Sequence, residues 1–309
     1  MKCKRCTDKA IVQLRSHNVA FCKPCFVFFF QRTVERAITR EHMFARDERV
    51  LVAVSGGKDS LALWDVLVDL GYETEGLYLG LGIGAYSNAS ERKTRAFAEK
   101  RGLRLQVVPL DKSEDGLAIP AVAAATRRAP CSACGTFKRH YFDRAALDGG
   151  FPVLATGHNL DDEAARLMGN VLHWQVPYLA KQLPVLFPTH PRFVRKVRPL
   201  FRTSELESAT YSFLRGIDYV VEECPNSHGA TQLVYKDILN RLEHSMPGSK
   251  LAVVTAFLSR GQPLFAGAPE AVDLGACERC GMPAAGELCG YCRLVAEVGR
   301  RRAQAVAHS

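Results

Sequence analysis

The stretch that decides the fold lies at residues 50–60, which read Val50-Leu51-Val52-Ala53-Val54-Ser55-Gly56-Gly57-Lys58-Asp59-Ser60. Its first five residues are apolar and rich in valine, which predicts a short buried strand. Two glycines follow, and a helical pattern begins at Lys58. At such a strand-to-helix turn the N–H groups of the loop and of the first helical turn point outwards without partners and form an anion site. We therefore predict that this loop binds phosphate.

The loop differs from the common mononucleotide loop, which places four residues between its first glycine and its Gly-Lys-Ser/Thr end. Here the loop is shorter, and Asp59 separates Lys58 from Ser60. The sequence Ser-Gly-Gly-Lys-Asp-Ser is similar to the pyrophosphate loop of the ATP-pyrophosphatase (PP-loop) family. That resemblance implies binding of ATP, adenylation of a carbonyl oxygen or carboxylate, and release of pyrophosphate. A plain glycine turn in an α/β sheet is the alternative.

Strand and helix patterns alternate along the following residues. We expect strands over 75–79, 103–108 and 152–156, and a helix over 90–101. This alternation predicts an α/β fold with a doubly wound parallel sheet. Ligands of such sheets bind beyond the carboxyl ends of the strands. Leu79, at the end of the second strand, is therefore expected to border the adenine.

The eleven cysteines fall into groups of four, three and four. The odd number, together with an N-terminus that lacks an apolar signal core, argues against a disulfide framework and for a cytoplasmic protein with no membrane segment. The outer groups have paired C-x2-C spacing, which predicts two four-thiolate zinc ribbons that depend on metal to fold. A redox CxxC pair is the alternative. The predicted zinc ligands are Cys3, Cys6, Cys22 and Cys25, then Cys277, Cys280, Cys289 and Cys292.

The middle group consists of Cys131, Cys134 and Cys224. Three thiolates can hold an iron–sulfur cluster by three of its irons and leave the fourth iron open. Alternatively, Cys131 and Cys134 form a persulfide or redox pair and Cys224 is a buried thiol. The spacing does not choose between these two interpretations.

The composition also divides the chain into predicted parts. We expect an N-terminal ribbon over 1–30, a catalytic domain with the cysteine triad over 31–260, a linker over 261–276, and a second ribbon with a basic tail over 277–309. An amphipathic helix is predicted over 31–47. In the first ribbon, four phenylalanines are expected to dock it on its neighbour, with RNA stacking as the alternative. They are Phe26, Phe28, Phe29 and Phe30.

The formal net charge of +9 suggests an acidic partner such as nucleic acid. Each four-thiolate zinc site carries a net −2, so that two sites would lower this charge to +5. The placement of the basic residues is therefore more informative than their number. Candidate RNA phosphate contacts are Arg192, Arg195, Lys196, Arg198 and the arginines at 300–302.

Taken together, these motifs resemble the TtuA-type tRNA 2-thiouridine synthetases over nearly the whole chain. The matching segments are both ribbons and residues 55–60, 81–87, 131–135, 156–164 and 223–226. The related wobble-uridine thiolases share both ribbons, whereas the cytidine thiolases lack them. Cys25 stands where some relatives carry histidine, which makes this zinc site all-thiolate.

The resemblance implies a tRNA uridine 2-sulfurtransferase that adenylates the uridine C2 oxygen and transfers sulfur via a [4Fe-4S] cluster on the three middle cysteines. The T-loop uridine, position 54, is the expected target. The implied cofactors are ATP, Mg²⁺, the cluster and two Zn²⁺. The implied partners are tRNA, a ubiquitin-like sulfur carrier with a C-terminal thiocarboxylate, and a second copy of the chain.

The loop and the resemblance together predict the site residues. Lys138, one helical turn past Cys134, is expected to stabilise charge at the reacting centre, with a solvated helix lysine as the alternative. Asp59 or Asp162 is expected to hold Mg²⁺, and the sequence does not choose between them. The predicted nucleotide-binding residues are Ala53, Ser55, Gly56, Gly57, Lys58, Asp59, Ser60, Leu79, Gly157 and Asp162.

Four other functions compete with this interpretation. The chain could be a thiolase of the wobble uridine, position 34, or a persulfide thiolase without a cluster. It could instead be another adenylating enzyme, such as an amide-forming or lysidine-type synthetase, which would not need Cys131. A zinc-ribbon RNA-binding module without catalysis would not release pyrophosphate through Lys58.

Overall fold

A six-stranded sheet forms the centre of the molecule in the computed structural model, which describes residues 1–113, 115–227, 229–265, 267 and 274–307. The strands lie in the order β5-β4-β3-β6-β8-β7. Neighbours from β5 to β8 are parallel, so the predicted doubly wound sheet is confirmed. Their bounds are β3 Val50–Val54, β4 Thr74–Gly80, β5 Leu105–Pro109, β6 Val153–Thr156, β7 Val185–Leu186 and β8 Arg195–Val197.

The edge strand β7 departs from the prediction because it runs antiparallel to β8. The chain between Leu186 and Arg195 is too short for the crossover that a parallel pair requires. A short loop therefore returns directly along the edge of the sheet.

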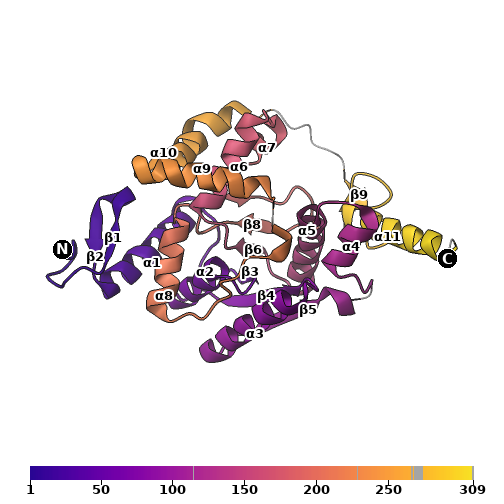
Figure 1. Cartoon of the computed structure of the whole chain (residues 1–309), viewed down its shortest axis with the longest axis horizontal. Helices are drawn as coiled ribbons and strands as arrows, with labels where there is room; N and C mark the ends of the chain where they lie inside the picture. Colours follow the sequence, from indigo (N-terminus) through magenta and orange to yellow (C-terminus); the bar gives the residue numbers. More distant parts are fainter. Residues whose placement is uncertain (114, 228, 266, 268–273, 308–309) are drawn as a thin grey trace.

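Helices cover both faces of this sheet, as Figure 1 shows. Successive strand residues point to opposite faces. Val52 belongs to the cluster with α1, α2 and α8, whereas Leu51 packs with α5 on the other face. The bounds of these helices are α1 Lys23–Arg40, α2 Lys58–Asp69, α5 Pro130–Asp148 and α8 Glu205–Arg215, and α3 spans Gly84–Arg101.

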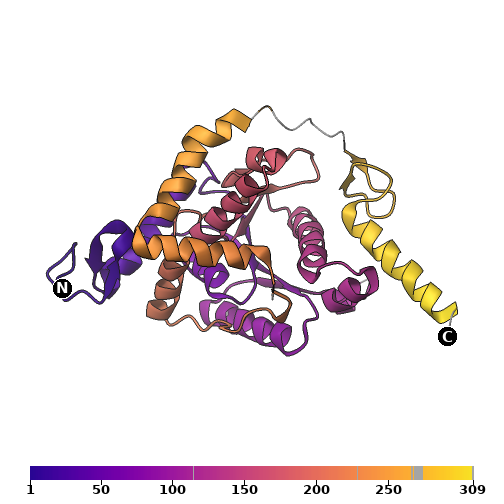
Figure 2. The ribbon, with the colours of Figure 1, turned by 45° about the horizontal axis from the view of Figure 1, so that its top comes forward.

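A second layer of helices lies over the carboxyl end of β6. Leu160 and Ala164 of α6 pack against Leu239 of α9 and Val254 of α10 in a separate apolar cluster. Figure 2 shows α9 and α10 crossing above the sheet. The bounds are α6 Leu160–Leu172, α7 Val176–Ala180, α9 Thr231–Ser245 and α10 Ser249–Ala256. None of the described helices is long and apolar enough to cross a membrane.

The N-terminal ribbon consists of the hairpin β1 (Val12–Leu14) and β2 (Val19–Phe21) and the start of α1. The helix predicted over 31–47 is wrong in its bounds, because α1 begins at Lys23, with a proline in its first turn, and ends at Arg40. The docking role of the phenylalanines is confirmed for Phe26 and Phe30, which are fully buried. Phe30 stacks on Tyr211 of α8, with 4.4 Å between ring centroids. Phe28 is exposed, with the Arg5 guanidinium over its ring.

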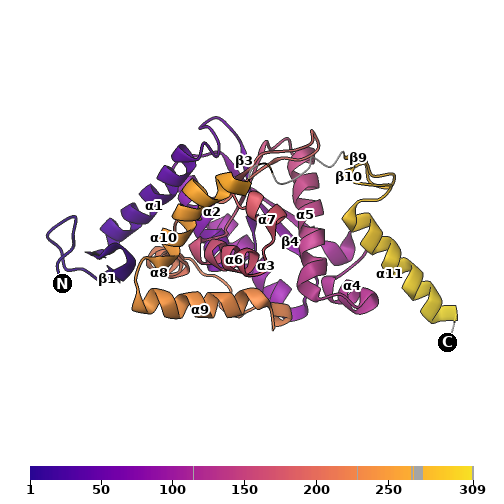
Figure 3. The ribbon, with the colours of Figure 1, turned by 90° about the horizontal axis from the view of Figure 1, so that it is seen from above.

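The C-terminal ribbon lies at the opposite end of the molecule (Figure 3). It contains β9 (Gly275–Ala276), β10 (Pro283–Ala284) and α11 (Gly290–Ala307). Leu294 and Val298 of α11 share an apolar cluster with Ile119 of α4 (Ile119–Thr126) and Phe137 of α5. Of the predicted linker 261–276, residues 261–265 are helical and residues 275–276 form β9. Residues 266 and 268–273 lie outside the described residues, as do 308–309 of the predicted tail.

Candidate nucleotide and cysteine-triad site

The predicted phosphate loop joins β3 to α2 with the expected geometry. Gly56 has φ +77°, and a Cβ there would lie 2.6 Å from the carbonyl oxygen of Ser90, so that only glycine fits. Within the described part of the chain, no side chain caps the N-terminus of α2. The N–H groups of its first turn have no partners within the helix. The loop therefore fits an anionic group, which is the chemistry of ATP phosphates.

Two serine side chains stabilise the conformation of this loop. Ser60 accepts a hydrogen bond from the N–H of Ser55 at 3.1 Å and donates one to the Gly57 carbonyl at 3.0 Å. The Ser55 and Ser60 hydroxyls lie 3.3 Å apart. Ser60 is buried, while Ser55 is exposed at the mouth of the loop. Ser55 is thus the more accessible hydroxyl of the two.

The loop after β6 packs directly on the phosphate loop. A Cβ at Gly157 would lie 2.8 Å from the backbone nitrogen of Ser60. Ala53 pairs in register with Thr156 at the same edge of the sheet, and it is half-buried. Leu79 is 6% exposed and packs with Leu51 below this edge. The structure thus brings Ala53 and Gly157 to the loop and places Leu79 at the rim of the core.

A network of opposite charges lies in front of the phosphate loop. The Lys58 ammonium is 2.7 Å from Glu205 and 3.2 Å from Asp59. The Lys236 ammonium is 2.6 Å from Asp162 and 3.3 Å from the same Glu205. Glu205 therefore joins two lysines that come from α2 and from α9.

Burial and charge act against each other on these groups. Burial raises the pKa of Asp59, against the effect of Lys58. Burial alone would lower the pKa of Lys236, but Asp162 and Glu205 raise it above the usual lysine value. The ammonium groups of both lysines are thus fixed as cations at the edge where phosphates would bind.

Asp162 is placed by the start of α6. Asn159 caps this helix, with its side-chain oxygen accepting from the Asp162 N–H at 3.1 Å, while Asp162 accepts from the Asn159 N–H at 3.1 Å. The Asn159 amide also donates to Asp59 at 3.0 Å. The two bonds between Asn159 and Asp162 form a capping box at the start of α6. It links the two aspartates that were candidates for Mg²⁺.

The cysteine triad is assembled at the same edge of the sheet. Cys131 and Cys134 lie in the first turn of α5, which precedes β6 and so begins at the carboxyl end of the strands. The Cys131 thiol is 3.4 Å from the carbonyl oxygen of Asn226, two residues beyond Cys224. The N–H of Val220, in the same segment, donates to Gly56 of the phosphate loop at 2.9 Å.

The separation of these thiols distinguishes the triad from a mononuclear site. Cys131, Cys134 and Cys224 do not gather within 4.8 Å of one another as the two four-cysteine groups do. A four-iron cluster holds its thiolates farther apart than a single ion does, so the triad fits a cluster better than a zinc ion. Burial raises the pKa of the Cys134 thiol, and the Lys138 ammonium beside it acts in the opposite direction. Lys138 thus lies beside Cys134, and its role in stabilising charge at the reacting centre stays a prediction.

Both four-cysteine groups have the geometry of a metal site. All four Sγ atoms of each group lie within 4.8 Å of one another. Cys6 and Cys22 are 3.5 Å apart, and Cys280 and Cys289 are 3.7 Å apart. A tetrahedron with metal–sulfur bonds of about 2.3 Å places its sulfurs about 3.8 Å apart. The thiols of both groups thus fit Zn²⁺.

Two residues of the charged network were not predicted from the sequence. Glu205 lies in the first turn of α8, which begins with a capping box of Ser204 and Glu207. Lys236 lies on α9, 74 residues beyond Asp162 in the chain. A lysine in an amphipathic helix carries no sequence signal for such a contact. Topology alone brings it to the site.

The predicted RNA contacts of the basic segment divide into two kinds. Arg198 is largely buried, 3.5 Å from Glu163, and Arg195 is 3.1 Å from Glu48, so both act within the protein. Lys196 is paired with Asp143 at 2.8 Å but lines a cleft beside the C-terminal ribbon. Arg192 is exposed and lies against that ribbon near Gly281.

The fold and the phosphate loop define a PP-loop protein, and comparison with known proteins agrees. The family model described as "PP-loop domain" matches residues 30–230. The model described as "2-thiouridine synthetase TtuA, N-terminal LIM domain" matches residues 2–27. The chain belongs to the TtuA family of PP-loop proteins.

Relatives extend this likeness over almost the whole chain. A protein of Thermus thermophilus named tRNA-5-methyluridine(54) 2-sulfurtransferase is 50% identical, over 97% of this chain and 93% of its own length. A protein of Pyrococcus horikoshii with the same name is 42% identical, over 95% and 93%. The structure of the U34-tRNA thiolase NcsA from Methanococcus maripaludis with its [4Fe-4S] cluster matches with a TM-score of 0.79 at 27% identity, and the match covers 95% of each chain.

Proposed function

We propose that this chain is an ATP-dependent tRNA 2-sulfurtransferase that thiolates the T-loop uridine at position 54. The observation that carries the proposal is the meeting of an uncapped phosphate loop and a cysteine triad at one edge of one sheet. The phosphate loop activates the uridine base, and the cysteine triad delivers sulfur to it. Position 54 is favoured over position 34 because the relatives named for position 54 are 50% and 42% identical, against 27% for the U34 thiolase.

The loop supplies the first half of the reaction. The uridine C2 oxygen is a poor leaving group, so it must first attack the α-phosphorus of ATP, with pyrophosphate departing. The N–H groups of Gly57 and Lys58 hold the phosphates, and the Lys58 ammonium turns from Glu205 towards them. Three carboxylates face two ammonium groups here, and the remaining negative charge favours Mg²⁺ entering with ATP at Asp59 or Asp162.

The triad supplies the second half. When bound, a [4Fe-4S] cluster on Cys131, Cys134 and Cys224 offers an open iron for the incoming sulfur. Lys138 stabilises the negative charge that develops when sulfur adds to C2 and AMP departs. The chain places both halves on helices that begin at the same sheet edge, so that positioning is its main contribution to the rate.

Two structural Zn²⁺ ions complete the proposed cofactors, one in each ribbon. Sulfur would arrive from a ubiquitin-like carrier with a C-terminal thiocarboxylate, and the protein would act in the cytoplasm. A second copy of the chain is a further proposed partner. A stripe of exposed apolar side chains on α9 supports it, because such a stripe is normally covered. It consists of Val234, Ile238, Leu242 and Met246.

The proposal is tested with protein reconstituted with iron and sulfide in the absence of oxygen. The assay supplies ATP, Mg²⁺, sulfide and tRNA transcripts, and nucleosides are identified by mass spectrometry. We expect 2-thiouridine in the wild-type transcript and none when cytidine replaces the uridine at position 54. Replacement at position 34 is the matched control and should leave thiolation unchanged.

Each alternative has its own outcome in this assay. Thiolation lost only with the position 34 transcript would assign the chain to the wobble thiolases. Thiolation by iron-free protein that still depends on Cys131 would indicate a persulfide route. Pyrophosphate release with no thionucleoside would point to another adenylating enzyme, and no pyrophosphate release would leave an RNA-binding module.

A further inference from the structure

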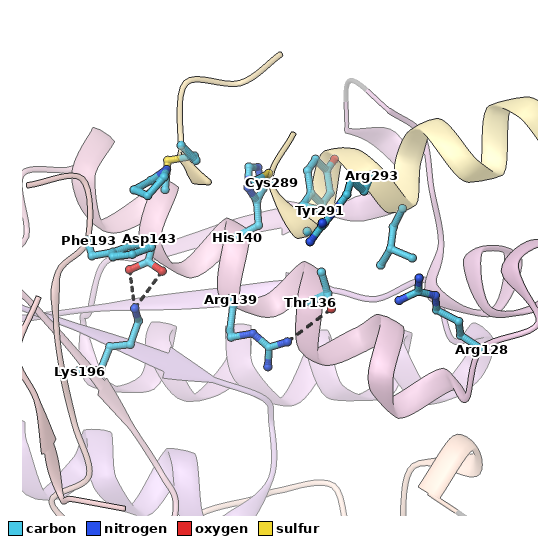
Figure 4. Close-up of a pocket in the computed structure, with 14 residues that line it drawn as sticks. Arg128, Thr136, Arg139, His140, Asp143, Phe193, Lys196, Cys289, Tyr291 and Arg293 are labelled. Carbon is cyan, nitrogen blue, oxygen red and sulfur yellow. Dashed lines mark hydrogen bonds and ion pairs between the residues drawn. The ribbon is translucent and has the colours of Figure 1, made fainter. Parts of the chain in front are cut away.

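A cleft of about 720 Å³ separates the C-terminal ribbon from the catalytic domain. Its floor is α5, and the start of α11 and β10 form the opposite wall, as Figure 4 shows. It does not belong to the phosphate loop or to the cysteine triad. One predicted RNA contact, Lys196, lines it, and the proposed chemistry of sulfur transfer gives it no role.

The charges that line the cleft are unbalanced. Among the described residues, four cationic side chains and a single carboxylate line it. That carboxylate, Asp143, is paired with Lys196 at 2.8 Å, and Arg128 lies 3.7 Å from Glu297, so Arg139 and Arg293 remain. Arg139 makes one long hydrogen bond, 3.4 Å to the Thr136 hydroxyl, and neither Arg139 nor Arg293 pairs with a carboxylate of the described residues. Such guanidinium groups favour a phosphate ligand, because their fork of donors matches its oxygens.

The remaining walls suit a nucleoside. Phe193, Met282 and Leu294 line the cleft between the cations. Figure 4 shows the cations spread along α5, with Lys196 and Phe193 at one end and Arg128 at the other. A single small anion would need them gathered at one point. Spaced cations with apolar and aromatic surface between them fit a strand in which phosphates and bases alternate.

The ribbon wall is fixed by an aromatic contact. The His140 ring of α5 lies flat on the Tyr291 ring of α11, with 3.9 Å between centroids and an angle of 5°. Burial first, and then Arg144, lowers the pKa of His140 to about 4, so this ring is neutral and does not repel its neighbours. The width of the cleft is therefore set by packing and not by the ligand.

We infer that this cleft binds the RNA substrate through its phosphates, beside the reacting uridine. The inference rests on the proposed function. It adds to that function the place where the RNA beyond the reacting uridine binds. Arg139 follows Cys134 by five residues on α5, which is about 7.5 Å along the helix axis. Adjacent positions such as Lys138 and Arg139 point about 100° apart, so one helix presents its lysine to the triad and its arginine to the cleft.

The test is the double variant Arg139→Gln, Arg293→Gln, with Arg144→Gln, Arg95→Gln as its matched control. The control removes the same charge from α5 and α3 outside the cleft, where Arg144 pairs with Asp148 and Arg95 with Glu91. Filter binding measures the affinity for unmodified tRNA from 50 to 300 mM salt. We expect the cleft variant to bind about tenfold more weakly, with a log–log salt slope reduced by about 1.4 to 1.8 for two lost phosphate contacts. The control should keep the wild-type slope.

A cleft variant with wild-type tRNA affinity and salt slope would overturn the inference. The cleft would then be free to bind another acidic ligand, such as an acidic protein. Zinc content and ATP affinity equal to wild type confirm that the variant is folded. A separate measurement tests the proposed function, which fails if the wild-type protein forms no thionucleoside. RNA binding and sulfur transfer are thus judged by different measurements.

Discussion

Replacing Lys236 by methionine should weaken ATP binding and leave the rate at saturating ATP nearly unchanged. Its ammonium is 2.6 Å from Asp162 and 3.3 Å from Glu205, and its side chain is 20% exposed. Without it, Asp162 faces the incoming phosphates without this cation, while Glu205 keeps Lys58 at 2.7 Å. Glu205 is 38% exposed, so water screens its contact with Lys236 and this contact is left out of the free energy. The contact between Lys236 and Asp162 is included in full. A charge-assisted hydrogen bond of this kind contributes about 2 kcal/mol.

That free energy corresponds to a KM for ATP about 30-fold higher in Lys236→Met. The rate at saturating ATP should change less than about threefold, because Lys236 does not reach the triad. Initial rates of 2-thiouridine formation against ATP concentration measure both quantities. Lys236→Arg should restore most of the affinity. Arg241→Met is the matched control, because Arg241 lies on the same helix and its ion pair among the described residues is with Asp237. A KM for ATP within twofold of wild type in folded Lys236→Met protein would refute this account of the charged network.

Three further changes test other parts of the structure. Cys224→Ser should lose the iron measured by elemental analysis and all thiolation, while zinc content and ATP affinity stay at wild-type values. Cys292→Ser should lower the zinc content from two ions per chain to one, because this thiol is fully buried in the C-terminal group. His17→Gln should lower the melting temperature at pH 6 but not at pH 9. The hydrogen bond to Glu207 raises the pKa of His17, so its stabilisation is complete below about pH 6.5 and is lost as the pH rises through the folded pKa. Equal effects at both pH values would contradict that assignment.

Local sequence signals predicted the elements that follow local rules. The valine-rich strand at Val50–Val54 and the uncapped start of α2 depend on residues within a few positions of one another. The cysteine pairs likewise carry their spacing in the sequence, and both four-thiol groups are confirmed. Backbone geometry and ligand chemistry determine such features, and tertiary packing changes them little.

The rest depended on tertiary packing. Helix α1 begins eight residues before the predicted position, at Lys23, because its first turn is also part of the metal ribbon. Arg195 and Arg198 resemble RNA-binding residues in the sequence, yet Glu48 and Glu163 neutralise them inside the fold. The sequence alone does not tell a paired arginine from a free one, because the partner lies more than 30 residues away.

Helix α5 connects the parts of the molecule that the sequence keeps separate. Its first turn carries Cys131 and Cys134, and Phe137, one turn further, packs against the C-terminal ribbon in the cluster that includes Cys277 and Cys292. A ribbon without its metal would lose the fold that supports this contact. The position of two triad thiols therefore depends on the four-thiol group of the C-terminal ribbon. We conclude that the ribbon acts on the chemistry by fixing α5, as well as by forming one wall of the cleft.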